Sequence, residues 1–234
     1  MRKILKIDIK DKVVIKSIMY EGVAKIGDPI QIAKKAEENS IDEVFLSNIT
    51  GSLYGHDNFK NILSNICSEV FLPITVGGGI KNIKDCETYF SLGADKISLN
   101  SILFDNKKLL NETVNNFGSQ SVTVLIQSKK IGNNWYAFRD MARHNTNVLV
   151  SDWIKFCEQS GAGEIILVSV DDDGLMRGLN YEMSNLCHNS NIPIILSGGF
   201  CGEKDIKKIS NYKNFNGLTV SSYFYNDHIT QKII

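Results

Sequence analysis

The chain has no excess of charge of either sign, because 26 lysine and arginine residues balance 26 aspartate and glutamate residues. A neutral protein lacks the field that attracts nucleic acid or an anionic membrane surface, so we expect neither partner. Its apolar runs are no longer than a strand, too short for the roughly 20 residues that cross a bilayer. Met1-Arg2-Lys3 leads directly into a predicted strand, without the apolar region of a secretion signal.

The sequence also lacks the patterns of a disulfide framework or a metal site. Its cysteines are odd in number, scattered and without a C-x-x-C pair: Cys67, Cys86, Cys157, Cys187 and Cys201. They indicate reduced thiols in a cytoplasmic protein. The acidic run Asp171-Asp172-Asp173-Gly174 is not a calcium loop, because Met176 stands where such a loop needs its glycine. We expect neither a metal nor another cofactor.

Proline is scarce, but two of the three prolines open matching runs, Pro73-Ile74-Thr75-Val76-Gly77-Gly78 and Pro193-Ile194-Ile195-Leu196-Ser197-Gly198. A second predicted strand precedes each run at a nearly equal interval, over residues 43–47 and 164–169. Residues 96–101 and 217–222 match in the same way downstream. The chain is therefore predicted to consist of two similar halves, offset by about 120 residues.

Eight predicted strands alternate with eight predicted helices. The strands are continuous apolar runs, as expected for burial on both faces. We expect strands at 4–9, 43–47, 74–76, 96–99, 122–126, 164–169, 194–196 and 217–220, and helices at 28–39, 59–70, 83–92, 107–117, 151–160, 181–189, 203–209 and the C-terminal end. A doubly wound sheet is the alternative. The half repeat favours one (β/α)8 TIM barrel domain over residues 1–234, built from two half-barrels.

Two long connections interrupt this alternation. The connection at 10–27 contains Val13-Val14-Ile15 and indicates a hairpin or a mobile flap. The connection after residue 126 contains Gly132-Asn133-Asn134-Trp135, which is typical of a hairpin turn.

Glycines follow each proline-led strand, and small polar residues end the next strand. Glycine between a parallel strand and a helix lets backbone N–H groups approach an anion. We therefore expect two phosphate sites, one formed by Gly78, Gly79, Asn100 and Ser101, the other by Gly198, Gly199, Ser221 and Ser222. Lys16, in the first long connection, is placed to reach a bound phosphate. Two tight turns without a ligand are the alternative.

Asp8 ends the first strand, and the repeat places Gln127 at the equivalent point of the fifth. Strands four apart in an eight-stranded barrel face each other across its mouth, where two carboxylates would form an acid/base pair. Here one of the two is an amide, which hydrogen-bonds but cannot usefully accept a proton. Asp173, after the sixth strand, is a third polar candidate. A carboxylate that only stabilises the next loop is the alternative for Asp8.

Over essentially its whole length the sequence resembles the cyclase subunit of imidazole glycerol phosphate synthase. The resemblance rests on Asp8-Ile9-Lys10-Asp11 with Lys16, Gly27-Asp28-Pro29, Val76-Gly77-Gly78-Gly79-Ile80, Gly93-Ala94-Asp95-Lys96, Phe117-Gly118-Ser119-Gln120, Gly161-Ala162-Gly163-Glu164 and Ser197-Gly198-Gly199. It implies a (β/α)8 barrel that takes ammonia from a partner glutaminase. The barrel adds this ammonia to a ribonucleotide with a phosphate at each end, then cyclises and cleaves the product as a lyase.

The chain departs from that family at the mouth and keeps its other end. The resemblance implies a second catalytic aspartate where Gln127 stands, an aspartate at Asn48 and a threonine at Leu175. At the opposite end it assigns an ammonia gate to Arg2, Glu43, Lys96 and Glu164, and partner docking to Asp95. Ion pairs that only stabilise the barrel bottom are the alternative for the ring.

Two classes of function follow. In the first, the chain is an enzyme subunit: a histidine-pathway cyclase with an unusual site, or a paralogue that gives ammonia to another acceptor, as in surface-sugar amidation. In the second, it is a catalytically silent barrel that binds and activates a glutaminase. Gln127 is the residue that distinguishes them. General acid–base catalysis contributes roughly 10²–10⁴-fold to a rate, so a cyclase that lacks one carboxylate of the pair should be impaired.

Overall fold

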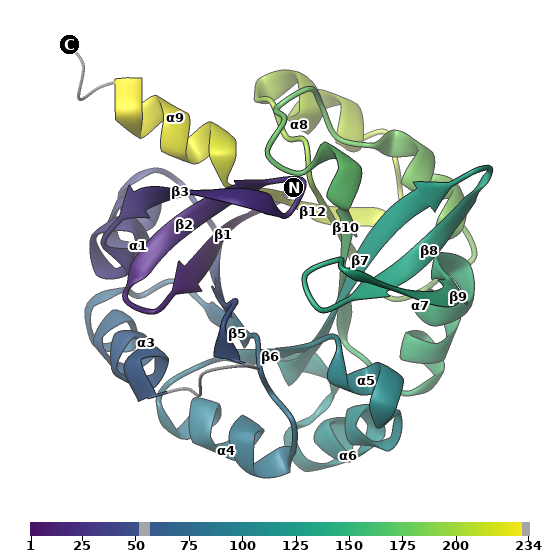
Figure 1. Cartoon of the computed structure of the whole chain (residues 1–234), viewed down its shortest axis with the longest axis horizontal. Helices are drawn as coiled ribbons and strands as arrows, with labels where there is room; N and C mark the ends of the chain where they lie inside the picture. Colours follow the sequence, from purple (N-terminus) through teal and green to yellow (C-terminus); the bar gives the residue numbers. More distant parts are fainter. Residues whose placement is uncertain (52–56, 231–234) are drawn as a thin grey trace.

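Eight parallel strands close into a barrel in the computed structural model, which describes residues 1–51 and 57–230. Each strand pairs with the next, and the last pairs with the first through Arg2–Gly217 to Leu5–Val220. Figure 1 shows the resulting ring. The strands are β1 Arg2–Lys10, β4 Glu43–Asn48, β5 Ile74–Gly77, β6 Lys96–Leu99, β7 Val122–Ile131, β10 Glu164–Ser169, β11 Ile194–Ser197 and β12 Phe215–Val220. The predicted (β/α)8 barrel is confirmed.

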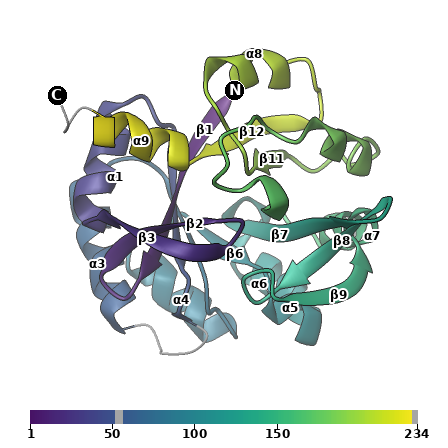
Figure 2. The same ribbon diagram turned by 45° about the horizontal axis from the view of Figure 1, so that its top comes forward.

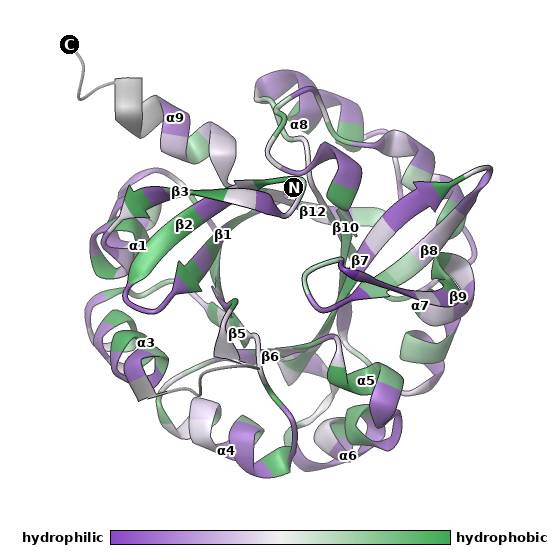
Figure 3. Ribbon diagram, in the orientation of Figure 1, coloured by the Kyte–Doolittle hydropathy of each residue, from purple (hydrophilic) through white to green (hydrophobic). Residues whose placement is uncertain are grey.

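Helices cover the outside of the ring. They are α1 Pro29–Glu38, α3 Asp57–Glu69, α4 Ile83–Ser91, α5 Ile102–Asp105, α6 Lys108–Phe117, α7 Val150–Gln159, α8 Glu203–Ile209 and α9 Ser222–Thr230. The first begins as the sequence indicates, since the Asp28 carboxylate accepts from two backbone N–H groups and Pro29 follows. Hydrophilic and hydrophobic residues alternate on the outer helices in Figure 3, as one-sided burial requires. Within the described residues, no helix combines the length and apolar character needed to cross a membrane.

The helix predicted at 181–189 is wrong. The structure has a 3₁₀ helix there, η3 Tyr181–Leu186, and two shorter ones elsewhere, η1 Ser119–Ser121 and η2 Val170–Asp172. The backbone N–H of Cys187 bonds the carbonyl of Ser184, three residues back. Serine and asparagine compete with the helix for backbone hydrogen bonds, and Pro193 is close behind, so this segment forms only the tighter, shorter turn.

Hairpins extend two equivalent strands beyond the barrel mouth. β1 continues into β2 Val13–Ile18 and β3 Glu21–Gly27, and β7 continues into β8 Asn134–Arg139 and β9 His144–Leu149. Both hairpins lie over the same end of the ring (Figures 1 and 2). The predicted turn near 132–135 is confirmed, and residues 10–27 form a hairpin. Since β1 and β7 lie four strands apart, the two hairpins repeat the half-barrel pattern.

Alternation along β1 determines what the barrel encloses. Leu5, Ile7 and Ile9 face outward into the core beneath the helices. Ile4 belongs to a separate core inside the ring, formed with residues such as Phe45 and Ile166 from other strands. Arg2, Lys6 and Asp8 share the parity of Ile4, so they also face the interior. The interior side chains of β1 therefore run from one end of the barrel to the other.

Candidate active site

Asp8 lies at the barrel mouth and is paired with a neighbour on its own strand. Asp8 is 5% exposed, and the Lys6 ammonium donates a hydrogen bond to its carboxylate. The same ammonium lies 5.6 Å from the centre of the Tyr20 ring, which the first hairpin brings over the mouth. Asp8 therefore forms a buried ion pair with Lys6 at the centre of the site.

Gln127 lies on β7 and is also 5% exposed. Its Oε1 accepts a hydrogen bond of 2.7 Å from the backbone N–H of Ala142. That residue ends a turn in which Asp140, Met141 and Ala142 have φ values of 54°, 57° and 56°, an uncommon run for residues other than glycine. Gln127 thus holds a strained turn over the mouth, and its NH2 group is the part left for a ligand.

Asp8 and Gln127 line one cavity of about 220 Å³. Gly78, Gly79, Asn100 and Ser101, the four residues predicted for the first phosphate site, line it too. Gly78 has φ +96°, and a Cβ there would lie 2.1 Å from the carbonyl oxygen of Asn48. The close approach of the loop to β4 therefore requires glycine.

The residues predicted for the second phosphate site line a separate small cavity of about 20 Å³. It is lined by Lys16, Asp173, Gly198, Gly199, Ser221 and Ser222, among others. Lys16 Nζ lies 2.6 Å from Asp173 Oδ2, so the cation and Asp173 both stand at this cavity. Gly198 repeats the geometry of Gly78: its φ is +99°, and a Cβ would lie 2.4 Å from the carbonyl oxygen of Ser169.

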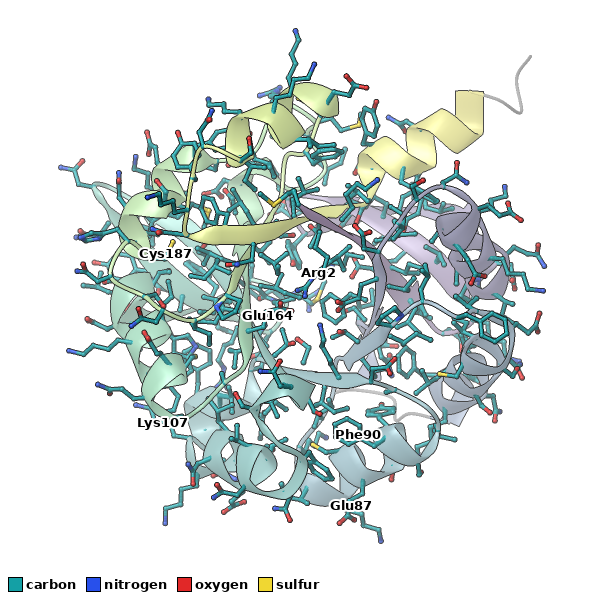
Figure 4. All side chains as sticks on the ribbon, turned by 180° about the vertical axis from the view of Figure 1, so that it is seen from behind. Arg2, Glu87, Phe90, Lys107, Glu164 and Cys187 are labelled. Atoms are coloured by element: carbon teal, nitrogen blue, oxygen red, sulfur yellow. The ribbon has the colours of Figure 1, made fainter. Side chains whose placement is uncertain are left out.

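Four charged side chains meet at the opposite end of the barrel. Lys96 lies 2.9 Å from Glu43 and 3.6 Å from Glu164, and Arg2 forms ion pairs with both carboxylates. Figure 4 shows Arg2 and Glu164 at the centre of this end. A wider hollow of about 550 Å³ opens beside them. The nearby Asp95 is exposed, and its carboxylate accepts from the backbone N–H of Ile74 at 2.7 Å.

Two residues of the mouth were missed by sequence reasoning. Lys6 was part of the first predicted strand but received no role, although its spacing of two from Asp8 places both side chains inside the barrel. Tyr20 reaches the site through the hairpin turn, where it and Met19 have positive φ values. Nothing in the local sequence indicated that position, since a hairpin's docking depends on the loops it meets.

The comparisons with known proteins agree with this geometry. A family model described as histidine biosynthesis protein matches residues 4–230. The chain belongs to this family. It is 38% identical to the imidazole glycerol phosphate synthase subunit HisF of Sulfolobus acidocaldarius, over 82% of this chain and 78% of the relative. It is 35% identical to the HisF of Campylobacter concisus, over 92% and 95%. It is 36% identical to the HisF of Lactococcus lactis subsp. cremoris, over 94% and 86%.

Family membership agrees with the resemblance found in the sequence. The resemblance to the synthase subunit is confirmed by these relatives. The roles of the individual residues at each end remain predictions.

Proposed function

We propose that this barrel takes ammonia from a glutaminase and adds it to a phosphorylated small molecule at its mouth, with an altered acid/base pair. One observation carries the proposal. A ring of four charged residues at one end and two glycine-lined cavities at the other are joined by β1, whose Arg2, Ile4, Lys6 and Asp8 face the interior in turn.

The two cavities support a ligand with phosphate at both ends. Each is lined by glycines with positive φ and by the small polar residues that end the following strand. Backbone N–H groups in such loops bind anions without needing a side chain. Lys16 adds a cation to the second cavity.

The replacement of one carboxylate of the expected acid/base pair by an amide supports a reaction different from histidine-pathway cyclisation. Asp8 keeps its carboxylate, whereas Gln127 offers an amide whose oxygen is already bonded to Ala142. We therefore favour a paralogue that supplies ammonia to an acceptor other than the histidine-pathway nucleotide, of the kind that amidates surface sugars. The five free cysteines support a reducing compartment, such as the cytoplasm, for this reaction.

Glutamine hydrolysis tests the partner. A glutaminase from the same organism should form a heterodimer with this chain and hydrolyse glutamine faster in its presence. Asp95→Asn keeps an acceptor for Ile74 but removes the charge, and we expect it to weaken the complex. Glu87→Gln is the matched control, because Glu87 is exposed on α4 at the rim (Figure 4). Unchanged hydrolysis with the wild-type chain would contradict the partner assignment.

The transfer of labelled amide nitrogen from glutamine separates the enzyme from the scaffold. In the enzyme, nitrogen-15 appears in a phosphorylated acceptor, and Asp8→Asn abolishes this without changing glutamine hydrolysis. The silent scaffold, our second candidate, is favoured by the amide at Gln127. It predicts faster hydrolysis with all of the label released as ammonium.

A further inference from the structure

Lys6 is a buried charge that the proposed reaction does not use. Its side chain is 6% exposed and stands in the barrel interior, between the apolar layer containing Ile4 and the mouth. Burying a charged group is costly unless it is paired and hydrogen-bonded. Asp8 supplies one partner, so the cost is only partly offset within the protein.

The pair fixes the protonation of Lys6. Burial opposes the charge and is the largest single effect, but Asp8, Tyr20 and Asp173 together outweigh it, and the pKa of Lys6 is raised above its ordinary value. A lysine that stays protonated is not a nucleophile. It is a fixed cation with three N–H donors, and among the described residues only the Asp8 carboxylate accepts a hydrogen bond from it.

Two further donors face the same cavity. Ser98 is 4% exposed, and its Oγ has no hydrogen-bond partner within residues 1–51 and 57–230. Gln127 uses its oxygen for Ala142, which leaves its NH2 group. Buried polar groups are normally hydrogen-bonded, so an unpartnered hydroxyl in a cavity wall indicates a place for a ligand atom. Lys6, Ser98 and Gln127 all line the 220 Å³ cavity.

We infer that Lys6, Ser98 and Gln127 form a carboxylate-binding subsite at the centre of the barrel mouth, so that the acceptor is a phosphorylated acid. The carboxylate takes hydrogen bonds from the ammonium, the hydroxyl and the amide. The phosphate of the same molecule lies at the Gly78–Gly79 loop, which also lines this cavity. In this arrangement Gln127 is a donor that recognises the substrate, because a second aspartate at that point would repel it. This inference rests on the proposed function for the identity of the acceptor.

Binding of two small probes tests the subsite without any ammonia chemistry. 3-Phosphoglycerate and sn-glycerol 3-phosphate share a phosphate and a three-carbon backbone, and differ in a carboxylate against a hydroxymethyl group. Calorimetry on the purified chain should show 3-phosphoglycerate binding about tenfold more tightly, since a charge-assisted hydrogen bond adds that much affinity. Lys6→Met should reduce this ratio to near one, and Lys6→Arg should retain it.

Removing Lys6 leaves Asp8 buried and unpaired, so the variants include a matched pair. Lys6→Met with Asp8→Asn keeps the cavity neutral and should also lose the preference. Ser98→Ala removes one donor with no change of charge and should lower the ratio about threefold while glycerol 3-phosphate binds as before. Equal binding of both probes to the wild-type chain, no saturable binding of either, or an unchanged ratio in these variants would overturn the subsite. A failed nitrogen transfer would count against the proposed function and leave this ratio untouched.

Discussion

The side-chain oxygen of Gln127 accepts a 2.7 Å hydrogen bond from the backbone N–H of Ala142. This bond joins β7 to a turn of three consecutive residues with positive φ, and so fixes the roof of the cavity. The residue at the position expected for a catalytic base therefore has a structural partner. That relationship determines how substitutions at this position should be designed.

Gln127→Asp should raise a very slow cyclisation rate. Given an ammonium salt and the histidine-pathway substrate, the unmodified chain should turn over very slowly, because it lacks half of the proton-transfer pair. The aspartate restores a base, but it is one methylene shorter and loses Ala142. We expect a gain of about tenfold, below the roughly 10²–10⁴-fold range of general acid–base catalysis. Product formation in a stopped assay measures it.

Gln127→Glu and Gln127→Leu are the controls for this series. The glutamate side chain keeps the length that reaches the N–H of Ala142 and adds a carboxylate. The cyclisation rate of Gln127→Glu should therefore match or exceed that of Gln127→Asp. The leucine has neither and should be inactive. Robust ammonia-dependent cyclisation by the unmodified chain would contradict the argument and restore a plain histidine-pathway cyclase.

The sequence was sufficient to predict the barrel and to bring together most of the residues named for its two ends. Proline-led apolar runs, glycines and their repeat predicted β5 and β11, and the loops after them do line cavities. The ring of Arg2, Glu43, Lys96 and Glu164 also assembles. These features depend on local sequence pattern and on strand order. In a closed barrel the strand order determines which residues lie together at each end.

Features that depend on contacts between loops were not predicted. The turn at Asp140–Ala142 contains no glycine, so nothing in it indicated three left-handed residues. Tyr20 enters the site because the N–H of Met19 bonds the carbonyl of Asp173, from a loop far away in the sequence. Lys6 was predictable, because its spacing of two residues from Asp8 on β1 places both side chains inside the barrel.

The glycines of the two predicted phosphate loops should stabilise the fold. Gly78→Ala and Gly198→Ala would place a Cβ 2.1 Å and 2.4 Å from a backbone carbonyl oxygen, at positive φ. We expect each to lower the free energy of unfolding by about 3 kcal/mol, from strain and overlap together. Gly132→Ala is the control. Its φ is +60° but nothing lies within 4 Å of the added atom, so about 1 kcal/mol is expected.

Urea unfolding of the three variants and the parent measures this difference. Equal losses for Gly78→Ala and Gly132→Ala would show that the loop moves away from Asn48 at no cost.

Cys157 should make the fold less stable at alkaline pH. It is fully buried in α7, and burial raises the pKa of its thiol from 9.0 to about 12. The neutral buried thiol contributes fully to the free energy of unfolding below its unfolded pKa near 9. This contribution is lost as the pH rises toward 12. Between pH 9 and 11 the free energy of unfolding should therefore fall by about 1 kcal/mol per pH unit from this group.

A comparison with Cys157→Ala isolates that contribution from the other titrating groups. The alanine variant should be less stable at pH 7 because of the cavity, but its stability should fall less steeply between pH 9 and 11. Parallel curves for the two proteins would show that Cys157 does not titrate in the unfolded chain as assumed.

Phosphate should immobilise the first hairpin through Lys16. The hairpin contacts the loop after β10 through Met19 and Asp173, and Lys16 Nζ lies 2.6 Å from Asp173 at the edge of the second cavity. A phosphate at the Gly198–Gly199 loop adds a second anionic partner for Lys16, so opening of the hairpin becomes less favourable. Cleavage by trypsin after the exposed Lys25 should slow about tenfold at saturating phosphate.

The second hairpin provides the control, since Lys130 is exposed on β7, is paired with Glu182 and does not line the second cavity. Cleavage there should not respond to phosphate. Lys16→Met should abolish the protection at Lys25 while leaving cleavage at Lys130 unchanged. If phosphate slowed both sites equally, or protected Lys25 in Lys16→Met as well, the effect would come from stabilisation of the whole barrel. A closing hairpin held by Lys16 would then be excluded.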